Sequence, residues 1–210
     1  MLTTGVEVSD QAMLIAKGAL VRRAYQKLFE FERLIEMMLE RQPSSVLEIG
    51  TAEGGAFWAF SQAATPDAVM VSVDYAPSLD EPCVSEDVIR SYTLPTQRCV
   101  TIRGDSQLEE TRDLALAESP DGYDFLFIDA DHTLPAVTRD HELYAPLVKP
   151  GGLVVFHDIM EPKVRRIAYQ RPTEVDVFWD QLDKPGPGRV WEFIDYSDTS
   201  FGGIGVYEQG

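Results

Sequence analysis

Residues Asp124–His132 read DFLFIDADH, and the rest of the chain can be placed around this stretch. Phe125–Ile128 form an unbroken apolar run, which has the length of a strand buried on both faces of a parallel sheet. The run ends abruptly in two carboxylates and an imidazole, Asp129, Asp131 and His132. In open parallel sheets, ligands bind beyond the carboxyl ends of the strands. We therefore predict that these three side chains lie at the ligand-binding edge of an α/β sheet.

Composition limits the class of protein. The chain has 210 residues and a formal net charge of -17. This length suits one domain, which we divide into a helical extension (1–42) and a sheet core (46–208). The negative charge argues against nucleic-acid and anionic-membrane partners, which need a positive surface. Without a secretory signal or a membrane-length apolar run, we expect a cytoplasmic protein with Cys83 and Cys99 as reduced thiols.

A glycine turn follows the first predicted strand, in the stretch VLEIGTAEGG from Val46 to Gly55. Gly50 allows a sharp turn, and Gly54 allows a ligand to approach the start of the next helix. A generic strand-to-helix turn would show the same glycines. Glu48 and Glu53 favour a ligand site, because carboxylates here would repel a pyrophosphate but suit an amino group and a sulfonium.

The next two predicted strands also end in polar groups. Val69–Val73 ends at Asp74, 24 residues beyond Gly50, where an acid can accept hydrogen bonds from both hydroxyls of a ribose. The alternative is an aspartate that only caps a loop. After the strand Arg98–Ile102, Asp105 and Ser106 either bind an adenine edge or cap the helix 108–118.

The amino-terminal region 9–41 is predicted to be helical, with Gly18 as the point where it breaks in two. An apolar stripe runs along it, made of Leu14, Val21, Tyr25, Leu28, Ile35 and Met38. We expect this stripe to pack on the sheet or on the mate of a homodimer. A partner surface or a substrate lid is the alternative.

Beyond the opening stretch, a helix is predicted over Leu134–Leu147, capped by Asp131 or Thr133, with His141 on its surface. The stretch 149–152, KPGG, is read as its stop signal. A fifth strand, 153–156, ends in His157 and Asp158, and strands over 190–196 and 204–207 form a terminal hairpin. The irregular segments 75–97 and 160–172, with the amino-terminal helices, are expected to shape a substrate pocket.

These units together resemble the class I S-adenosylmethionine-dependent methyltransferases. The resemblance implies a Rossmann-like, doubly wound and mostly parallel sheet of seven strands, with a terminal antiparallel hairpin. VLEIGTAEGG looks like the first motif of that superfamily, Asp74 like its ribose-binding acid, and the turn at Gly104 like its adenine-side turn. The implied cofactor residues are Glu48, Gly50, Thr51, Glu53, Gly54, Asp74, Tyr75, Gly104, Asp105, Ser106 and Asp129.

Within that superfamily, FIDADH and GGLVVFHD look like the metal-dependent small-molecule O-methyltransferases of the catechol, caffeoyl-coenzyme A and macrolide-sugar types, with cephalosporin hydroxylase-like relatives. This resemblance implies a divalent metal, Mg or Mn, on Asp129, His157 and Asp158, with His132 as general base. The sequence departs from the pattern at His157, where the group has Asp or Glu, and an imidazole suits Mn, Fe or Zn better than Mg. His157 is alternatively a second base or a structural histidine.

The predicted function is therefore methyl transfer from S-adenosylmethionine to a hydroxyl of a small molecule, assisted by a metal. Asp131 is assigned to helix capping rather than to catalysis. One alternative is a non-catalytic or regulatory protein that binds the cofactor. An NAD(P)-dependent oxidoreductase is disfavoured because Gly50–Gly55 is not a G-x-G-x-x-G fingerprint. Methylation of protein or nucleic acid is disfavoured by the charge and by the lack of an Asn-Pro-Pro-Tyr-type motif after the fourth strand.

Overall fold

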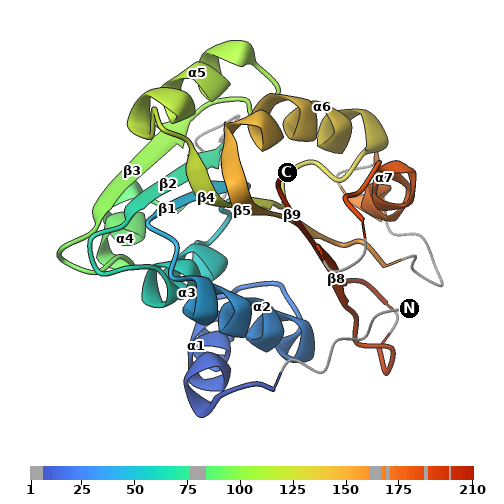
Figure 1. The fold of residues 1–210 in the computed structure, drawn as a ribbon, viewed down its shortest axis with the longest axis horizontal. Helices are drawn as coiled ribbons and strands as arrows, with labels where there is room; N and C mark the ends of the chain where they lie inside the picture. The colour runs from blue at the N-terminus through green and yellow to red at the C-terminus, as the bar shows by residue number, and fades with distance from the viewer. Residues whose placement is uncertain (1–6, 76–83, 161–166, 169–170, 187–188, 199) are drawn as a thin grey trace.

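The chain forms a central sheet between two layers of helices (Figure 1). This computed structural model describes residues 7–75, 84–160, 167–168, 171–186, 189–198 and 200–210. Seven strands form the sheet in the order β3-β2-β1-β4-β5-β9-β8. Their bounds are β1 Ser45–Ile49, β2 Val69–Asp74, β3 Arg98–Arg103, β4 Tyr123–Ile128, β5 Val148–His157, β8 Val190–Phe193 and β9 Ile204–Glu208. The first five in sequence pair in parallel, and β9 and β8 pair antiparallel, so the predicted fold class is confirmed.

The strand order creates the predicted ligand-binding edge. β1 pairs with β2 on one side and with β4 on the other, so successive strands are added in opposite directions from β1. The connections leaving β1 and β4 therefore separate at their carboxyl ends, which is where open α/β sheets form a crevice. A small separate pairing joins β6 (Ile167–Ala168) and β7 (Arg171–Pro172).

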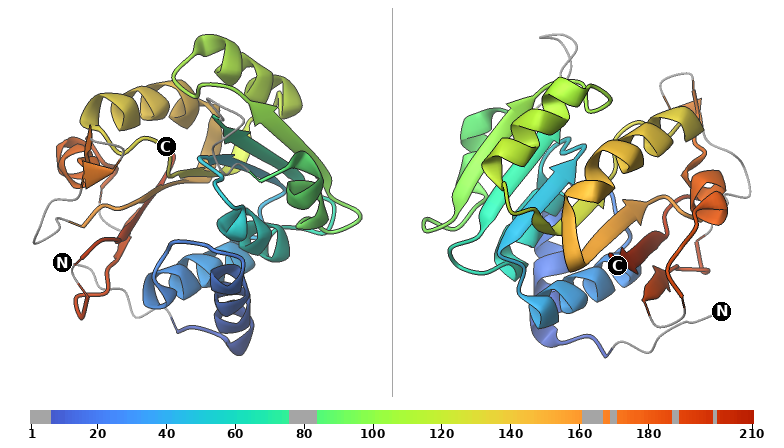
Figure 2. Two further views of the ribbon diagram at one scale, coloured as in Figure 1. Left: turned by 180° about the vertical axis from the view of Figure 1, so that it is seen from behind. Right: turned by 45° about the horizontal axis from the view of Figure 1, so that its top comes forward.

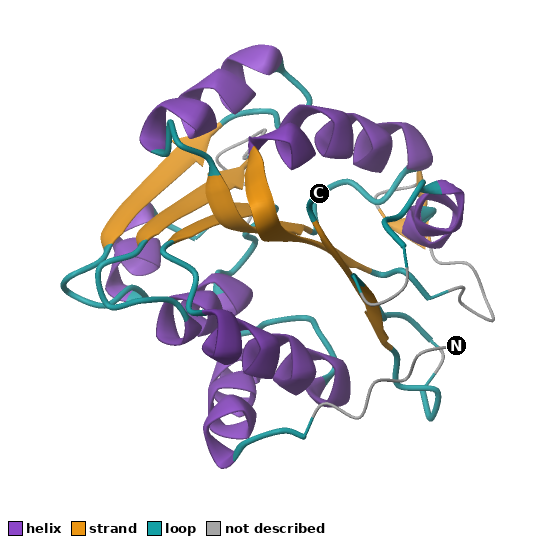
Figure 3. Ribbon diagram, viewed as in Figure 1, coloured by secondary structure: helices purple, strands orange, loops and turns teal. Residues whose placement is uncertain are grey.

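Helices cover both faces of the sheet, as the views in Figures 2 and 3 show. One layer contains α1 Asp10–Val21, α2 Leu28–Arg41, α3 Gly55–Ala63 and α4 Glu86–Ser91. The other contains α5 Glu109–Glu118, α6 Leu134–Tyr144 with the short 3-10 helix η1 Ala145–Leu147, and α7 Val175–Gln181. Alternate strand residues feed two cores: Phe125 and Phe127 face the first layer, whereas Leu126 and Ile128 face the second. This is why the strand segment is apolar throughout.

The amino-terminal helices differ from their prediction in two ways. The break lies at residues 22–27, not at Gly18, which is inside α1. A Cβ at Gly18 would lie 2.5 Å from the Trp58 ring, so this glycine lets α1 pack closely on α3. Leu14 and Val21 of the predicted stripe are exposed by 67% and 82%. The buried face of α1 is made of three alanines and Ile15 instead, and a search for large apolar side chains overlooks the alanines.

The helical segment after β4 ends at Leu147, as predicted, but the stretch 149–152 that follows it is part of β5. Tyr123 pairs with Val148 and Phe125 with Leu153, so residues 149–152 lie opposite the single residue Asp124. The pairing of β4 with β5 is therefore irregular at this point.

His141 is not a surface residue. Its ring packs against Phe156 and Phe178, and its Nε2 lies 2.9 Å from the hydroxyl of Tyr207. Burial lowers the pKa of His141 below its usual value, as expected for an imidazole held in an apolar setting.

Some predictions concern residues that lie wholly or partly outside the described ranges. Cys99 is a free thiol, whereas Cys83 lies outside the described residues. The same holds for residues 76–83 and for most of 161–172 in the two segments expected to shape a substrate pocket. No helix in the described ranges is both long and apolar enough to cross a membrane.

Candidate active site

The glycine turn after β1 packs directly against the end of β4. Gly50 has a φ of +91°, and a Cβ on it would lie 2.2 Å from the carbonyl oxygen of Asp129. Only glycine permits this contact at a positive φ. The Asp129 N–H donates to Ile49 O at 2.9 Å, which joins the two strand ends. The sequence therefore brings the two predicted halves of the site into backbone contact.

Asp74 holds the glycine turn from the neighbouring strand. Its Oδ2 accepts hydrogen bonds from the N–H groups of Thr51 at 3.1 Å and Ala52 at 2.7 Å. Ala52 has a φ of 46°, a left-handed conformation that is costly for a residue with a Cβ. Burial raises the pKa of Asp74, although the two N–H donors act in the opposite direction. Asp74, the acid predicted to bind a ribose, thus fixes the shape of the glycine turn.

Glu48 is a carboxylate buried in β1, next to the hydroxyl of Thr51. It is 1% exposed in the middle of the sheet, and neither oxygen accepts a hydrogen bond from the described residues. The nearby hydroxyl of Thr51 pairs with Ser72 Oγ at 2.6 Å. Burial raises the pKa of Glu48 well above its usual value, and the charges of Asp129 and Asp74 raise it further. A buried acid without a donor is costly, so this position fits a ligand that brings a positive donor.

Asp129 is the centre of a cluster of acids and imidazoles. Its Oδ1 lies 3.0 Å from His132 Nε2 and 3.3 Å from His157 Nδ1. Its Oδ2 accepts a hydrogen bond from Gln26 Nε2 at 2.8 Å. Burial alone would raise the pKa of Asp129, but the two imidazoles hold it well below its usual value. The carboxylate is therefore ionised and fully engaged.

His132 is held between two carboxylates. Its Nε2 faces Asp129, and its Nδ1 lies 3.3 Å from Asp158 Oδ2. Burial would lower the pKa of His132, but the hydrogen bond and charge of Asp129, with the charge of Asp158, raise it. An imidazolium satisfies both contacts, because both of its nitrogens are donors.

His157 is the second imidazole of the cluster. It is 3% exposed, and its Nδ1 also lies 3.7 Å from Asp158 Oδ1. Burial would lower its pKa, but the charges of Asp129 and Asp158 raise it to about 9. Its Nε2 is buried and has no partner in the described part of the chain.

The donor types of this cluster suit a divalent cation, but their arrangement is that of a hydrogen-bonded group. Carboxylate oxygens and imidazole nitrogens are common ligands of Mn, Fe and Zn. Here the nitrogens face carboxylates as donors, and an imidazolium has no lone pair for a metal. No three His, Cys, Asp or Glu side chains among the described residues form a metal-holding group.

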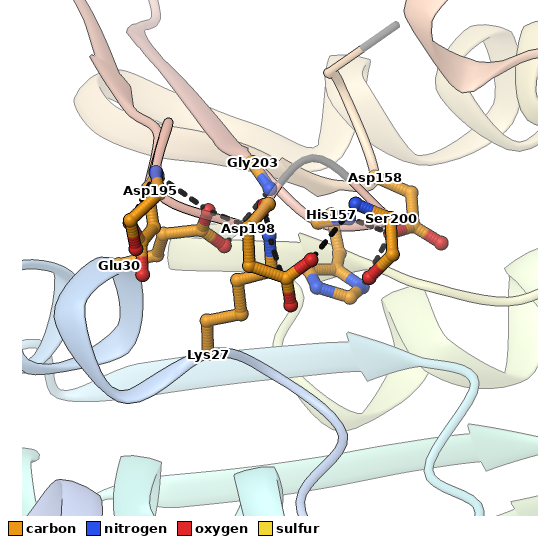
Figure 4. A network of polar contacts seen from close by, with 10 residues as sticks. Lys27, Glu30, His157, Asp158, Asp195, Asp198, Ser200 and Gly203 are labelled. Atoms are coloured by element: carbon orange, nitrogen blue, oxygen red, sulfur yellow. Dashed lines mark hydrogen bonds and ion pairs between the residues drawn. The ribbon is translucent and has the colours of Figure 1, made fainter. Parts of the chain in front are cut away.

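Asp158 is supported by the loop between β8 and β9, as Figure 4 shows. It has a φ of 63°, and its Oδ1 accepts a hydrogen bond from Gly202 N–H at 2.8 Å. The fully buried Glu30 of α2 holds the same loop, because its two oxygens accept from Asp195 N–H and Gly203 N–H, each at 2.8 Å. Non-glycine residues at positive φ often occur at functional sites.

The α1–α2 connection supplies site residues that the sequence did not reveal. Gln26, which is 5% exposed, bonds Asp129, and the Tyr25 hydroxyl donates to Glu53 Oε1 at 2.7 Å. Glu53 also lies 4.0 Å from Arg23. The only sequence signal was a polar interruption of the helical pattern, which does not show where the connection lies in space.

The remaining predicted cofactor residues lie around this edge. Gly54 ends the turn with a φ of 79°, and Tyr75 is 58% exposed after β2. Gly104 packs against Thr111, and Asp105 Oδ1 accepts from Gln107 N–H at 3.0 Å, so Asp105 caps a turn rather than α5. Leu108, not Ser106, is the capping residue of α5.

Asp131 has the structural role expected of it, although it is not the capping residue of α6. That residue is Thr133, whose side chain makes no capping hydrogen bond. Asp131 Oδ1 instead accepts from the Thr133 N–H at 2.9 Å, one turn ahead of the helix.

Known proteins resemble this chain in sequence or in fold. An uncharacterised protein of Acanthamoeba polyphaga mimivirus is 25% identical over 95% of this chain and 87% of its own length. An O-methyltransferase from Bacillus cereus in complex with S-adenosylhomocysteine superposes with a TM-score of 0.58 at 16% identity, covering 98% of this chain and 94% of that one.

A methyltransferase of the mycinamycin biosynthetic pathway, in complex with Mg, S-adenosylhomocysteine and mycinamycin VI, gives a TM-score of 0.60 at 18% identity. This chain is covered to 95% and that one to 54%. Residues 47–159, which contain the glycine turn and the whole acid–imidazole cluster, match the family model described as a methyltransferase domain. The chain belongs to this methyltransferase family.

Proposed function

We propose that this protein transfers the methyl group of S-adenosylmethionine to a hydroxyl of a small molecule. The observation that carries the proposal is that Glu48, a buried acid beside the glycine turn, receives no hydrogen bond from the described residues. Glu48 also lies close enough to Asp129 for the charge of Asp129 to raise the Glu48 pKa. A ligand with an ammonium group and a sulfonium supplies the positive donor that this position lacks. The complexes named for the Bacillus cereus and mycinamycin enzymes support the same cofactor.

S-adenosylmethionine, when bound, supplies an electrophilic methyl group. The chain contributes position: Asp74 shapes the ribose side, Glu48 receives the amino-acid end, and both are fixed by the strands that carry them. Methyl transfer requires the acceptor oxygen to be held in line with the methyl carbon, so positioning supplies much of the rate. The acid–imidazole cluster lies beyond β4 and β5, on the opposite side of β1 from Asp74. This separation leaves the acceptor to be bound on the Asp129 side.

We assign the role of general base to His132. A hydroxyl is a weak nucleophile until its proton is removed, and an imidazole can accept that proton. His132 can accept a proton only as the neutral imidazole, so the imidazolium described above must first lose one of its two N–H protons to solvent and the matching carboxylate contact. The contact with Asp158, at 3.3 Å, is longer than that with Asp129, at 3.0 Å, and is the one we expect to open.

Metal assistance is a second form of the same reaction. It is supported by the Mg in the mycinamycin enzyme and by two carboxylates, Asp129 and Asp158, at neighbouring strand ends. A divalent cation, when bound, would polarise the acceptor hydroxyl. His157 would have to lose its proton to join these ligands, so this form predicts proton release on metal binding. Activity that survives exhaustive chelation would rule it out.

The competing functions fit less well. A pyrophosphate of NAD(P) would lie near Glu48 and Glu53, which repel it. A non-catalytic cofactor-binding protein has no use for two imidazoles and two carboxylates gathered within 3.0–3.7 Å of one another beyond β4 and β5. For partners, we propose a homodimer through the exposed face of α1, where Leu14 and Val21 lie.

Binding of the product cofactor tests the proposal before any acceptor is known. Calorimetry should show S-adenosylhomocysteine binding to the purified protein. Asp74→Ala should weaken it about 10-fold to 100-fold, since a charged hydrogen-bond partner contributes about 1.5–3 kcal/mol. No binding to the wild type would overturn the proposal. A screen of small hydroxyl compounds with methyl-labelled cofactor then identifies the acceptor.

A further inference from the structure

We propose that Gln26 is a cofactor-binding residue: its Nε2 holds Asp129, and its Oε1 accepts a hydrogen bond from the α-ammonium of S-adenosylmethionine. This inference rests on the proposed function and adds to it a residue from outside the matched region 47–159. It also gives the α1–α2 connection a direct role in binding.

The orientation of the Gln26 amide is fixed by chemistry. An ionised carboxylate can only accept hydrogen bonds, so the group 2.8 Å from Asp129 Oδ2 must be the amide nitrogen. Asp129 is ionised because two imidazoles face its other oxygen. The amide oxygen of Gln26 must therefore point away from Asp129.

No described residue donates a hydrogen bond to that oxygen. Gln26 is 5% exposed, and its Oε1 is buried with no hydrogen-bond partner among the residues described. Leaving a buried acceptor unpaired costs about 1–3 kcal/mol. An oxygen that is held in this way, on a side chain whose other end is already engaged, is suited to a donor from a ligand.

The backbone around Gln26 is built to hold it there. The Ala24 N–H donates to Ala19 O at 3.0 Å, which closes the end of α1. A Cβ on Gly55 would lie 2.4 Å from Ala24 N, so the connection rests directly on the start of α3. The Tyr25 hydroxyl bonds Glu53 in the glycine turn at 2.7 Å. The two residues before Gln26 thus anchor the connection to the predicted cofactor loop and to the start of α3.

The position of Gln26 along the sheet edge indicates which donor of S-adenosylmethionine its amide oxygen would accept from. Asp74, on the ribose side, follows β2, whereas Asp129 follows β4, and β1 with Glu48 lies between them. Of the donors of S-adenosylmethionine, the ribose hydroxyls belong on the Asp74 side. The α-ammonium is the donor that reaches toward Glu48 and Asp129. Gln26 then supplies a neutral acceptor beside the charged acceptor Glu48.

Two ligands separate this contact from the rest of the pocket. S-adenosylhomocysteine carries the α-ammonium, whereas 5′-methylthioadenosine keeps the adenosine and the thioether but lacks the amino-acid end. Gln26→Met preserves size and removes the amide. We expect it to weaken S-adenosylhomocysteine binding about 10-fold to 100-fold in calorimetry and to leave 5′-methylthioadenosine binding within about 2-fold, since the lost bond involves a charged group.

Three controls make the result decisive. Asp74→Ala should weaken both ligands, because both carry the ribose. Gln11→Met, on the exposed side of α1, should weaken neither. The melting temperature of Gln26→Met should be close to that of the wild type, and unchanged 5′-methylthioadenosine binding shows independently that the methionine variant is folded.

The outcomes distinguish this inference from the proposed function. Wild-type protein that does not bind S-adenosylhomocysteine overturns the function itself. If the wild type binds but Gln26→Met binds both ligands as well as the wild type does, Gln26 has no contact with the cofactor. Equal weakening of both ligands by Gln26→Met would also overturn the assignment, because the effect would not depend on the ammonium.

Discussion

The two halves of the sheet edge differ in whether their carboxylates have partners among the described residues. On the β1–β2 side, Glu48 is a buried acid to which the described residues offer no donor. On the β4–β5 side, Asp129 and Asp158 each face imidazole nitrogens within 3.0–3.7 Å. The first half is incomplete without a ligand, whereas the second is neutralised by its own side chains.

This difference separates binding from chemistry. A half with an unpaired acid gains free energy when a cationic donor arrives, so it is prepared to bind. A half whose charges are already paired contributes to the stability of the fold and must rearrange to act on a substrate. Variants on the two sides should therefore change different quantities.

The largest effect should come from Asp129→Ala. This change leaves the buried His157 and the partly buried His132 without their shared carboxylate, and breaking a buried ion pair by removing one partner costs about 3–5 kcal/mol. We expect the free energy of unfolding, measured by urea denaturation, to fall by about that amount.

A nearby aspartate provides the matched control. Asp131 accepts a hydrogen bond from Thr133 N–H at 2.9 Å, ahead of α6. Asp131→Ala should therefore cost about 1 kcal/mol, as for the loss of a helix cap. Equal losses for the two variants would mean that the cluster does not stabilise the fold as we describe.

The sequence predicted much of this edge because strand order places distant residues together. The apolar run 125–128 and the strand before Asp74 are easy to recognise, and parallel strands end on one side of a sheet. Asp129, His157 and Asp74 could therefore be placed at one edge without knowing any contact. Their partners could not be assigned in this way, because hydrogen bonding depends on side-chain direction.

The site residues that could not be predicted from the sequence are positioned by the packing of the helices. Gln26 is in a connection whose position depends on how α1 packs against Trp58 through Gly18. Glu30 is a charged residue that is fully buried, where helical patterns predict an exposed one. Both depend on tertiary contacts between segments far apart in sequence, which local periodicity does not encode.

The second-largest effect should be a pH dependence of the free energy of unfolding, which comes from the β4–β5 half of the edge. The pKa of His157 is raised to about 9, and a raised pKa means that the folded state holds the proton more tightly than the unfolded state does. The stability from His157 is complete below its unfolded pKa near 6.5 and is lost as pH rises through about 9. One pKa unit corresponds to about 1.4 kcal/mol, so the loss is on the order of 3 kcal/mol.

Urea denaturation between pH 7 and about pH 10 measures this loss. Removing the titrating group with His157→Gln should make the stability much less dependent on pH in that range. Some slope remains in the variant, since the pKa of His132 is also raised. A variant with the full wild-type slope would show that His157 does not carry the proton.

The smallest effect should come from Glu48→Gln, on the incomplete half. This variant should be more stable than the wild type, whereas Asp129→Ala should be less stable. Burial raises the pKa of Glu48, so its stabilising contribution is present at low pH and is lost as pH rises through the folded value. Glutamine has the same shape and no charge to bury, so the variant should be about 1 kcal/mol more stable at pH 8 and nearly equal to wild type at pH 5.

The same variant should bind S-adenosylhomocysteine about 10-fold more weakly, because the ammonium loses its charged partner. Glu40→Gln, on the exposed end of α2, is the control and should change neither quantity. A residue selected for stability would lose stability when neutralised, whereas a residue held ready for a ligand should lose affinity and gain stability. A Glu48→Gln protein that is less stable at pH 8, or that binds as tightly as wild type, would remove the distinction between the two halves.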